Sequence, residues 1–219
     1  MIMKGFSAKR LMLVLFIGAM LFSLPVLGQQ NQAGSDVVSV DFAGIADFPS
    51  DSAMNDIYGT IPGIKLGLTF WINEGVGPGS LGLGGEVQLL YGTGKPIGAE
   101  DAEAVAAENG YYVSIHDYLT VFPILANVYY RFKVPNQPKL KPYAGAGFGY
   151  YILTETIEIT GDISDSESTT LNDFGYHFLG GVQYSWGFAE LRYILVNLRD
   201  SEGEANDFNG LQFLLGARF

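Results

Sequence analysis

The sequence predicts an all-β fold, an eight-stranded antiparallel up-and-down transmembrane β-barrel. The first observation is alternation: from about residue 36 to the last residue, apolar and polar side chains follow the period of two that is typical of strands. The second is composition, with 48% hydrophobic residues, 16% charged residues, 29 Gly, 13 Tyr and 15 Phe. The third is that long and short connections alternate along the chain. An open sheet edge is not viable in hydrocarbon, so strands that cross a membrane close into a barrel.

Charge and cysteine content exclude several classes of protein. The chain has no Cys, which excludes thiol chemistry, Cys-ligated metal sites and an acylated Cys anchor. The formal net charge is −11, and nucleic-acid binding needs clustered Lys and Arg, so no nucleic-acid partner is expected. The many aromatic residues argue against disorder.

Residues 1–28 have the pattern of a secretory signal peptide. A basic start precedes an apolar run over 11–22, and small residues at Val26 and Gly28 suit a cleavage site near Gly28. The alternative is a transmembrane anchor, but the run is shorter than the ~20 residues that span a bilayer. The mature domain is therefore expected over residues 29–219. The basic residues of the start are Lys4, Lys9 and Arg10.

Eight strands are expected in the mature domain. In the first, Val38, Val40 and Phe42 alternate with Ser39 and Asp41, and the later strands repeat this pattern. The approximate ranges are Val37–Ile45, Ile61–Ile72, Leu81–Tyr91, Tyr118–Phe132, Leu140–Ile159, Leu171–Ser185, Phe188–Leu198 and Phe208–Phe219.

The connections predict the orientation of the barrel. They measure about 15, 8, 26, 7, 11, 2 and 9 residues, and bacterial barrels have short periplasmic turns and longer extracellular loops. Both termini are therefore expected in the periplasm. The turn between strands four and five carries Lys133, Lys139 and Lys141, whereas the expected extracellular loops are acidic. Their acidic residues are Asp47, Asp51, Asp56, Glu100, Asp101, Glu103, Glu108, Asp162, Asp165, Glu167, Asp200, Glu202, Glu204 and Asp207.

The polar face of the strands is expected to point into the lumen, because an eight-stranded barrel is just wide enough to be filled by side chains. Opposite charges can pair there, which lowers the cost of removing them from water. A glycine row (Gly145, Gly147 and Gly149) would make room for large neighbours. The inward polar set is Lys65, Glu86, Gln88, Asn127, Arg131, His177, Glu190, Arg192, Gln212 and Arg218.

Two segments resemble the small outer-membrane β-barrel family typified by OmpX, the OmpA membrane domain and OmpW. Residues 141–150 (KPYAGAGFGY) are similar to a Gly-rich strand that is frequent in this family. Residues 210–219 (GLQFLLGARF) resemble its C-terminal insertion signal, with Leu211, Phe213, Leu215 and Phe219 in the apolar positions. The resemblance covers roughly residues 36–219. It implies outer-membrane localisation, contact with outer-membrane lipid and lipopolysaccharide, and recognition by the barrel assembly machinery.

The candidate site is a polar network in the lumen. Glu86, Arg131, Glu190 and Arg192 could gate a narrow pore, but a structural ion-pair network is the favoured interpretation. The full set is Lys65, Glu86, Arg131, His177, Glu190, Arg192 and Arg218.

Catalytic, cofactor and metal sites are not expected. His177 is interpreted as a hydrogen-bonded lumen residue rather than a catalytic or metal-binding one. His116 follows Ser114 by two residues, but the sequence places no second His or carboxylate beside them. The acidic loops are interpreted as solvated surface, with divalent cations as the alternative partner. A short helix is expected over Ala99–Asn109, because Ala and Glu dominate it.

Three functions of different classes follow. The leading hypothesis is a structural or surface-interaction barrel whose loops meet lipopolysaccharide, other cells or host molecules. The second is a narrow channel for small solutes, or for apolar compounds that leave sideways into the membrane. The third is an enzyme acting on outer-membrane lipid.

Overall fold

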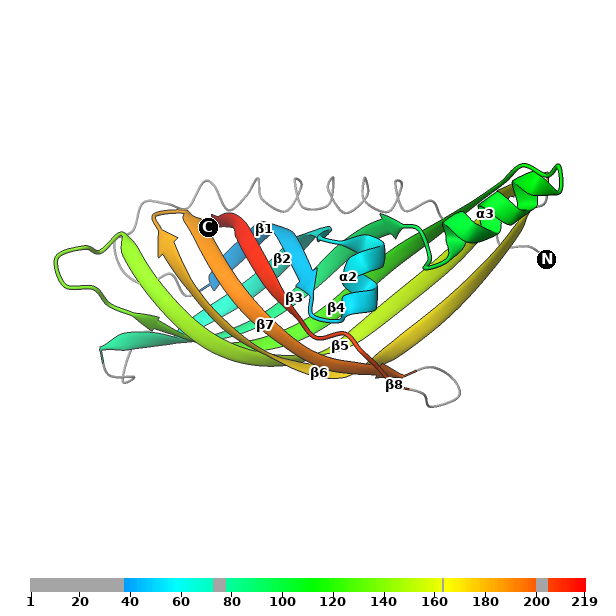
Figure 1. Ribbon diagram of the computed structural model, residues 1–219. Helices are drawn as coiled ribbons and strands as arrows, with labels where there is room; N and C mark the ends of the chain where they lie inside the picture. Colours follow the sequence, from blue (N-terminus) through cyan, green and yellow to red (C-terminus); the bar gives the residue numbers. More distant parts are fainter. Residues whose placement is uncertain (1–37, 73–77, 163, 200–204) are drawn as a thin grey trace.

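The computed structural model describes residues 38–72, 78–162, 164–199 and 205–219 (Figure 1). The predicted signal peptide and its cleavage site lie outside these residues. In the described part of the chain, no helix is long and apolar enough to cross a membrane.

Strands make up most of the described chain. They are β1 (Val38–Pro49), β2 (Ile61–Ile72), β3 (Gly79–Gly94), β4 (Val113–Phe132), β5 (Leu140–Gly161), β6 (Asp165–Tyr184), β7 (Gly187–Arg199), β8 (Ala205–Asp207) and β9 (Gly210–Arg218). Two helices lie between strands, α2 (Ser52–Tyr58) after β1 and α3 (Ala99–Glu108) after β3.

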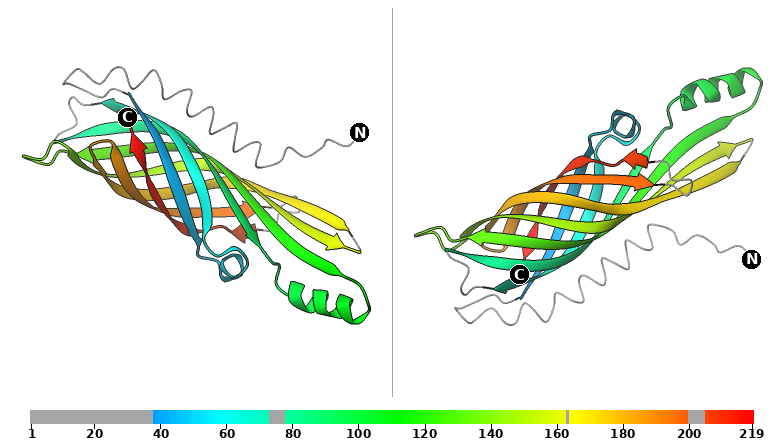
Figure 2. Two further views of the ribbon diagram at one scale, coloured as in Figure 1. Left: turned by 90° about the horizontal axis from the view of Figure 1, so that it is seen from above. Right: turned by 90° about the horizontal axis from the view of Figure 1, so that it is seen from below.

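Eight antiparallel up-and-down strands close into a ring. Each strand from β1 to β7 pairs with the next, β7 pairs with β9, and β9 returns to β1 with Gly44 opposite Leu215. The short β8 pairs with the end of β7 just before β9 begins. Figures 1 and 2 show these strands tilted around one barrel axis. The predicted fold class is confirmed.

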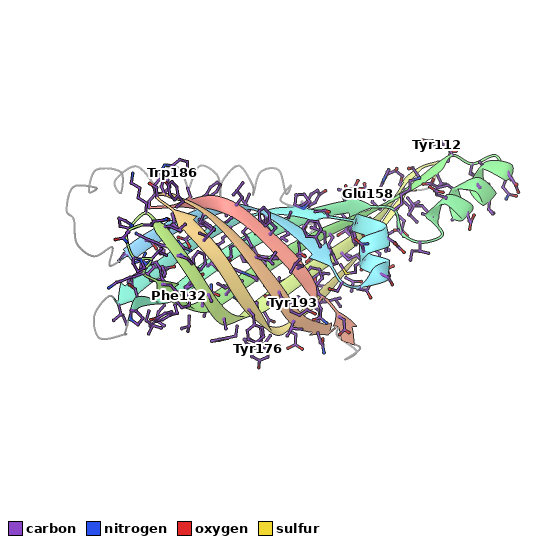
Figure 3. The ribbon with its side chains drawn as sticks, turned by 60° about the vertical axis from the view of Figure 1, so that its left-hand side comes forward. Tyr112, Phe132, Glu158, Tyr176, Trp186 and Tyr193 are labelled. Carbon is purple, nitrogen blue, oxygen red and sulfur yellow. The ribbon has the colours of Figure 1, made fainter. Side chains whose placement is uncertain are left out.

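Period-two alternation separates the two surfaces of the wall. Large apolar residues such as Phe70, Phe148 and Phe178 are exposed on the outside, while the intervening residues are buried inside. Figure 3 shows Phe132 and Trp186 near one end of the barrel and Tyr176 and Tyr193 on its outer wall. The apolar outer wall with aromatic residues at its ends fits a hydrocarbon layer between two interfaces.

The predicted third long connection is wrong. Residues 160–170 were expected to form a loop, but β5 continues to Gly161 and β6 already begins at Asp165. β4 likewise begins at Val113 rather than near Tyr118. Thr and Ser residues along this part of β5 and β6 suit strands, and paired hydroxyls such as Thr156 and Ser168 (2.9 Å) join them across the ladder.

The predicted helix at Ala99–Asn109 corresponds to α3, whereas α2 was not predicted. The α2 segment has only seven residues, too few for a reliable periodic pattern. Its start is marked by Asp51, whose carboxylate accepts a hydrogen bond from the backbone N–H of Met54 at 2.9 Å.

The barrel is taller on one side. On β5 the outward residues change from Phe148, Tyr150 and Ile152 to Thr154 and Thr156, which locates one edge of the apolar wall, the extracellular edge in the orientation that the connections predict. The strands β4, β5 and β6 continue beyond this edge, and α3 lies at the far end of the extension (Figures 1 and 2). We call residues 113–117, 154–161 and 165–171 the extracellular sheet.

Candidate functional site

The centre of the lumen holds a buried ion-pair network. Lys65 on β2 lies 2.9 Å from a carboxylate oxygen of Glu86 on β3, and 3.9 Å from oxygens of both Asp41 and Glu190. All four side chains are almost completely buried. A lone buried charge is very costly, so this cation among three carboxylates requires further positive charge nearby.

Two arginines supply that charge. Arg192 on β7 donates to Glu86 and, at 2.6 Å, to Glu190. Arg218 on β9 makes a two-pronged pair with Asp41, with both N···O distances at 2.7 Å. The central layer therefore contains three cations and three anions, in direct contact across the lumen. Planar guanidinium groups suit this arrangement because their donors match both oxygens of a carboxylate.

Neutral side chains complete the hydrogen bonding of the carboxylates. Gln88 donates to Glu86 at 2.8 Å, and Tyr143 donates to Glu190 at 3.0 Å. A buried charge is stable only when its remaining lone pairs are also satisfied. These contacts add neutral donors to two of the three carboxylates.

Aromatic rings form the periplasmic layer below the ion pairs. Trp71, Tyr129, Tyr143 and Leu179 make one buried cluster. The Arg131 guanidinium carbon lies 4.1 Å from the centre of the Trp71 ring, a cation–π contact. Arg131 therefore lies at the periplasmic end of the lumen, against an aromatic ring.

His177 lies on the inward face of β6, in contact with the Asn127 side chain. Its Nε2 is 2.5 Å from the amide oxygen of Asn127, so the ring nitrogen donates that bond. A Cβ added to Gly147 would collide with both side chains. The glycine row on β5 thus leaves room for His177 and Asn127 to meet.

Most inward residues in the extracellular half of the lumen are apolar, which the expectation of a polar lumen did not include. The inward residues there are Leu, Ile, Val and Phe from most of the strands. They include Ile45, Ile61, Leu90, Leu119, Val121, Leu153, Leu171, Val196, Leu198 and Phe208. Asp41 was also missing from the predicted network, although its inward position in the alternation of the first strand could have revealed it.

The helix α2 packs on this apolar layer. Tyr58 belongs to the buried cluster, and Met54 and Ile57 pack against it. A Cβ on Gly94 of β3 would overlap the Ile57 carbonyl, so the helix backbone lies directly on the strand. Tyr58 donates a hydrogen bond to Glu155 of β5 at 3.1 Å, which joins the low side of the barrel mouth to the tall side.

Among the described residues, the β6 edge of the extracellular sheet has no second partner strand. Residues 165–171 of β6 pair with β5, whereas the β7 ladder begins only at the Asn172–Arg199 pair. Figure 3 shows Glu158 and Tyr112 on this extension, far from the periplasmic end. Asp165 and Glu167 on one face of the sheet, and Glu158 on the other, make this extension acidic.

Ser114 and His116 lie at the start of β4, with Ser114 Oγ 3.2 Å from His116 Nε2. The sequence placed no carboxylate beside them, but the register sets Glu158 opposite His116. Glu103 of α3 lies close by and accepts a hydrogen bond from the Ile115 backbone N–H at 2.7 Å. The pairing with Lys95 and this backbone bond lower the pKa of Glu103.

Acidic residues do not converge into a metal centre in the described part of the chain. Across residues 38–72, 78–162, 164–199 and 205–219, no group of three or more His, Cys, Asp or Glu side chains has an arrangement suited to a metal ion. Asp162 instead accepts a hydrogen bond from the Tyr112 backbone N–H at 2.7 Å. This bond joins the residue before β4 to the residue after β5.

The predicted insertion-signal residues line the outer wall of the last strand. Leu211, Phe213 and Leu215 are exposed on β9, and Phe219 follows the strand. The backbone of Phe219 exchanges two hydrogen bonds with Val40, at 2.9 and 3.0 Å. The last residue is therefore part of the barrel closure.

Comparison with known proteins agrees with this architecture. Neisserial surface protein A matches with 15% identity and a TM-score of 0.50, covering 85% of this chain and 97% of that chain. The attachment invasion locus protein Ail of Yersinia pestis, solved with the heparin analogue sucrose octasulfate, matches with 12% identity and a TM-score of 0.46, covering 83% and 96%. No curated protein matches the sequence. A family model described as the outer membrane protein beta-barrel domain matches residues 14–219, so the chain belongs to this family of outer-membrane barrels.

Proposed function

We propose that this chain is a non-enzymatic surface-interaction protein: a barrel with a largely filled lumen that anchors an acidic extracellular sheet. The observation that carries the proposal is the continuation of β4, β5 and β6 past the apolar wall, with residues 165–171 unpaired on one side in the described structure. An exposed strand edge offers backbone N–H and C=O groups to an extended segment of another protein. The central ion pairs hold the barrel shut beneath it.

The partner is expected to be an exposed protein segment on another cell or a host surface. The acidic side chains Glu158, Asp165 and Glu167 favour a partner with basic residues. Contact of the same loops with the phosphates of lipopolysaccharide would need bridging divalent cations, because both surfaces are negative.

A shortened hairpin tests the proposal. Replacing residues 157–167 by Asn-Gly keeps the Thr156–Ser168 pair and closes the strands with a two-residue turn. Cells that display this variant should lose adhesion to protein-coated surfaces that cells with the unaltered chain bind. A matched variant shortened in the periplasmic turn, residues 134–138, should bind normally. Equal adhesion by the hairpin variant, or no adhesion above empty cells by the unaltered chain, would refute the proposal.

A second candidate is a narrow passage for hydrophobic solutes, which the apolar extracellular layer under α2 favours. The charged layer below would then have to open. Conductance of the refolded protein in a planar bilayer tests for a pore, and the absence of resolvable current at any voltage would reject it.

The lipid-modifying alternative depends on Ser114 and His116, which are in hydrogen-bond range. Mass spectrometry of lipid A from cells with and without the protein tests it. We expect identical profiles, and a change in acyl chains that disappears in Ser114→Ala would establish an enzyme instead.

A further inference from the structure

Two carboxylates and a phenol meet beneath α2. Asp117 of β4 is only 1% exposed, and neither of its carboxylate oxygens receives a hydrogen bond of good geometry from a described residue. Glu155 of β5 lies on the same inner face and accepts from the Tyr58 hydroxyl at 3.1 Å. A buried carboxylate without a donor is costly, so this group needs a proton or a cation.

The helix seals the two carboxylates from above. Asp117 is opposite Gly94 in the β3–β4 ladder, and Gly94 is covered by the backbone of Ile57. A Cβ at Gly92 would come within 3.2 Å of the Tyr58 ring. The same helix that covers the acidic pair also covers the apolar extracellular layer. Movement of α2 would therefore expose both together.

No described element around the pair brings a cation to it. The titratable groups that face it are Tyr58 from α2, Asp117 from β4 and Glu155 from β5, while β3 contributes glycines at this height. Lys95, which follows β3, is paired with Glu103 at 2.8 Å. Burial and the neighbouring Asp117 raise the pKa of Glu155, because both disfavour a second negative charge.

We propose that Asp117 and Glu155 share one proton when α2 is closed, and that loss of this proton releases α2 as a lid over the apolar layer of the lumen. The closed state holds one proton more than the open state, in which water solvates both carboxylates. Raising the pH therefore shifts the equilibrium toward the open state, by up to about tenfold per pH unit for one proton. This movement of α2 does not depend on whether the extracellular sheet binds a partner.

Cysteine accessibility measures the position of the lid, since the chain has no Cys of its own. Met54→Cys places a thiol on the covered face of α2, and Ile97→Cys places one on a side chain that is 73% exposed. The labelling rate of the first relative to the second removes the effect of thiol ionisation. With EDTA present, this ratio should rise severalfold from about pH 5 to about pH 9 in detergent-refolded protein.

Two neutral variants decide the mechanism. Asp117→Asn and Glu155→Gln keep the shape and resemble the protonated pair, so each should hold the ratio low at every pH. This outcome differs from simple loss of structure, which would raise the ratio. Tyr58→Phe keeps both carboxylates and removes one donor to Glu155, so the ratio should be higher throughout and still rise with pH.

Three results would overturn the proposal. The first is a ratio that is independent of pH in the unaltered background. The second is the same rise with pH in both neutral variants as in the unaltered background. The third is a ratio that falls when Ca²⁺ is added at fixed pH, which would show that a metal ion rather than a proton holds the pair. The heat-dependent gel shift of folded barrels confirms folding of each variant, and either neutral variant suffices if the other does not fold.

Discussion

Glu86 is the residue on which the lumen contacts converge. Arg192 and Gln88 donate hydrogen bonds to its carboxylate, and the Lys65 ammonium pairs with it at 2.9 Å, from three different strands. Charged side chains at the centre of a barrel are therefore held by mutual pairing, and the loss of one member leaves the others uncompensated. Single glycines matter in the same way, because the absence of a side chain at Gly147 leaves the space that Asn127 and His177 occupy.

Removing the charge of Glu86 should destabilise the barrel strongly. Glu86→Gln leaves Lys65 and Arg192 with excess positive charge, and breaking a buried pair costs about 3–5 kcal/mol. Urea unfolding in detergent micelles measures the change. The control, Glu167→Gln on the exposed part of β6, should stay within about 0.5 kcal/mol of the unaltered protein. Equal stabilities of the two variants would contradict the network.

Adding one methyl group at Gly147 should also be costly. Its Cβ would meet Asn127 and His177, so Gly147→Ala is expected to lose about 1–3 kcal/mol through overpacking. Gly180→Ala is the matched control, because a Cβ there meets nothing within 4 Å. Urea unfolding in detergent micelles compares the stabilities of the two variants. Equal stabilities would show that the lumen can relax around the added methyl group.

At the scale of elements, the strands differ in how far they extend past the apolar wall. The strands β1, β2, β7 and β9 end near its edge, whereas β4, β5 and β6 continue as a sheet. The helix α2 covers the low side and α3 is attached to the tall side through Glu103. The extracellular end is thus built from two helices on an uneven rim.

Detaching α3 should make its loop sensitive to protease. Glu103 bonds Lys95 at 2.8 Å and the Ile115 N–H at 2.7 Å, so Glu103→Ala should speed cleavage within residues 95–112 by the broad-specificity protease proteinase K severalfold. Glu108→Ala, at the other end of the helix, should cleave at the unaltered rate. These bonds hold the pKa of Glu103 below its usual value, so the attachment persists at neutral pH and is lost as the pH falls through that lowered pKa.

At the scale of the whole molecule, closure joins the two ends of the domain. β1 pairs with β9, and Arg218 meets Asp41 across a sequence separation of 177 residues. A ring without open edges is what allows the backbone to lie in hydrocarbon. We therefore expect assembly in the cell to depend on how the last strand is presented.

The C-terminal aromatic residue should matter for assembly more than for stability. Phe219→Ala keeps the backbone bonds to Val40 but removes the proposed insertion signal, so outer-membrane levels in cells should fall severalfold while refolding in detergent is retained. Phe178→Ala, which also removes an exposed aromatic ring from the outer wall, is the control and should assemble normally. Equal levels of the two variants would reject a special role for the terminus.

Processing of the leader gives a second whole-molecule prediction. N-terminal sequencing of the protein purified from outer membranes should begin at Gln29, because small residues precede it at Val26 and Gly28. Retention of Met1 would favour the anchor interpretation.

The eight barrel strands and the faces of their residues could be predicted from the sequence, because a period of two is a local property and a membrane barrel needs opposite polarity on the two sides of its wall. The sequence also predicted the inward positions of Lys65, Glu86 and Arg192 and the helix at Ala99. The sequence could not show which of the inward charges meet, because their pairing depends on the folded barrel. Glu86 and Arg192 are 106 residues apart, and their heights in the lumen depend on strand tilt and on the register at which the ring closes. For the same reason the apolar layer, the position of α2 and the approach of Asp117 to Glu155 could not be predicted, since each arises where distant strands converge on one level of the barrel.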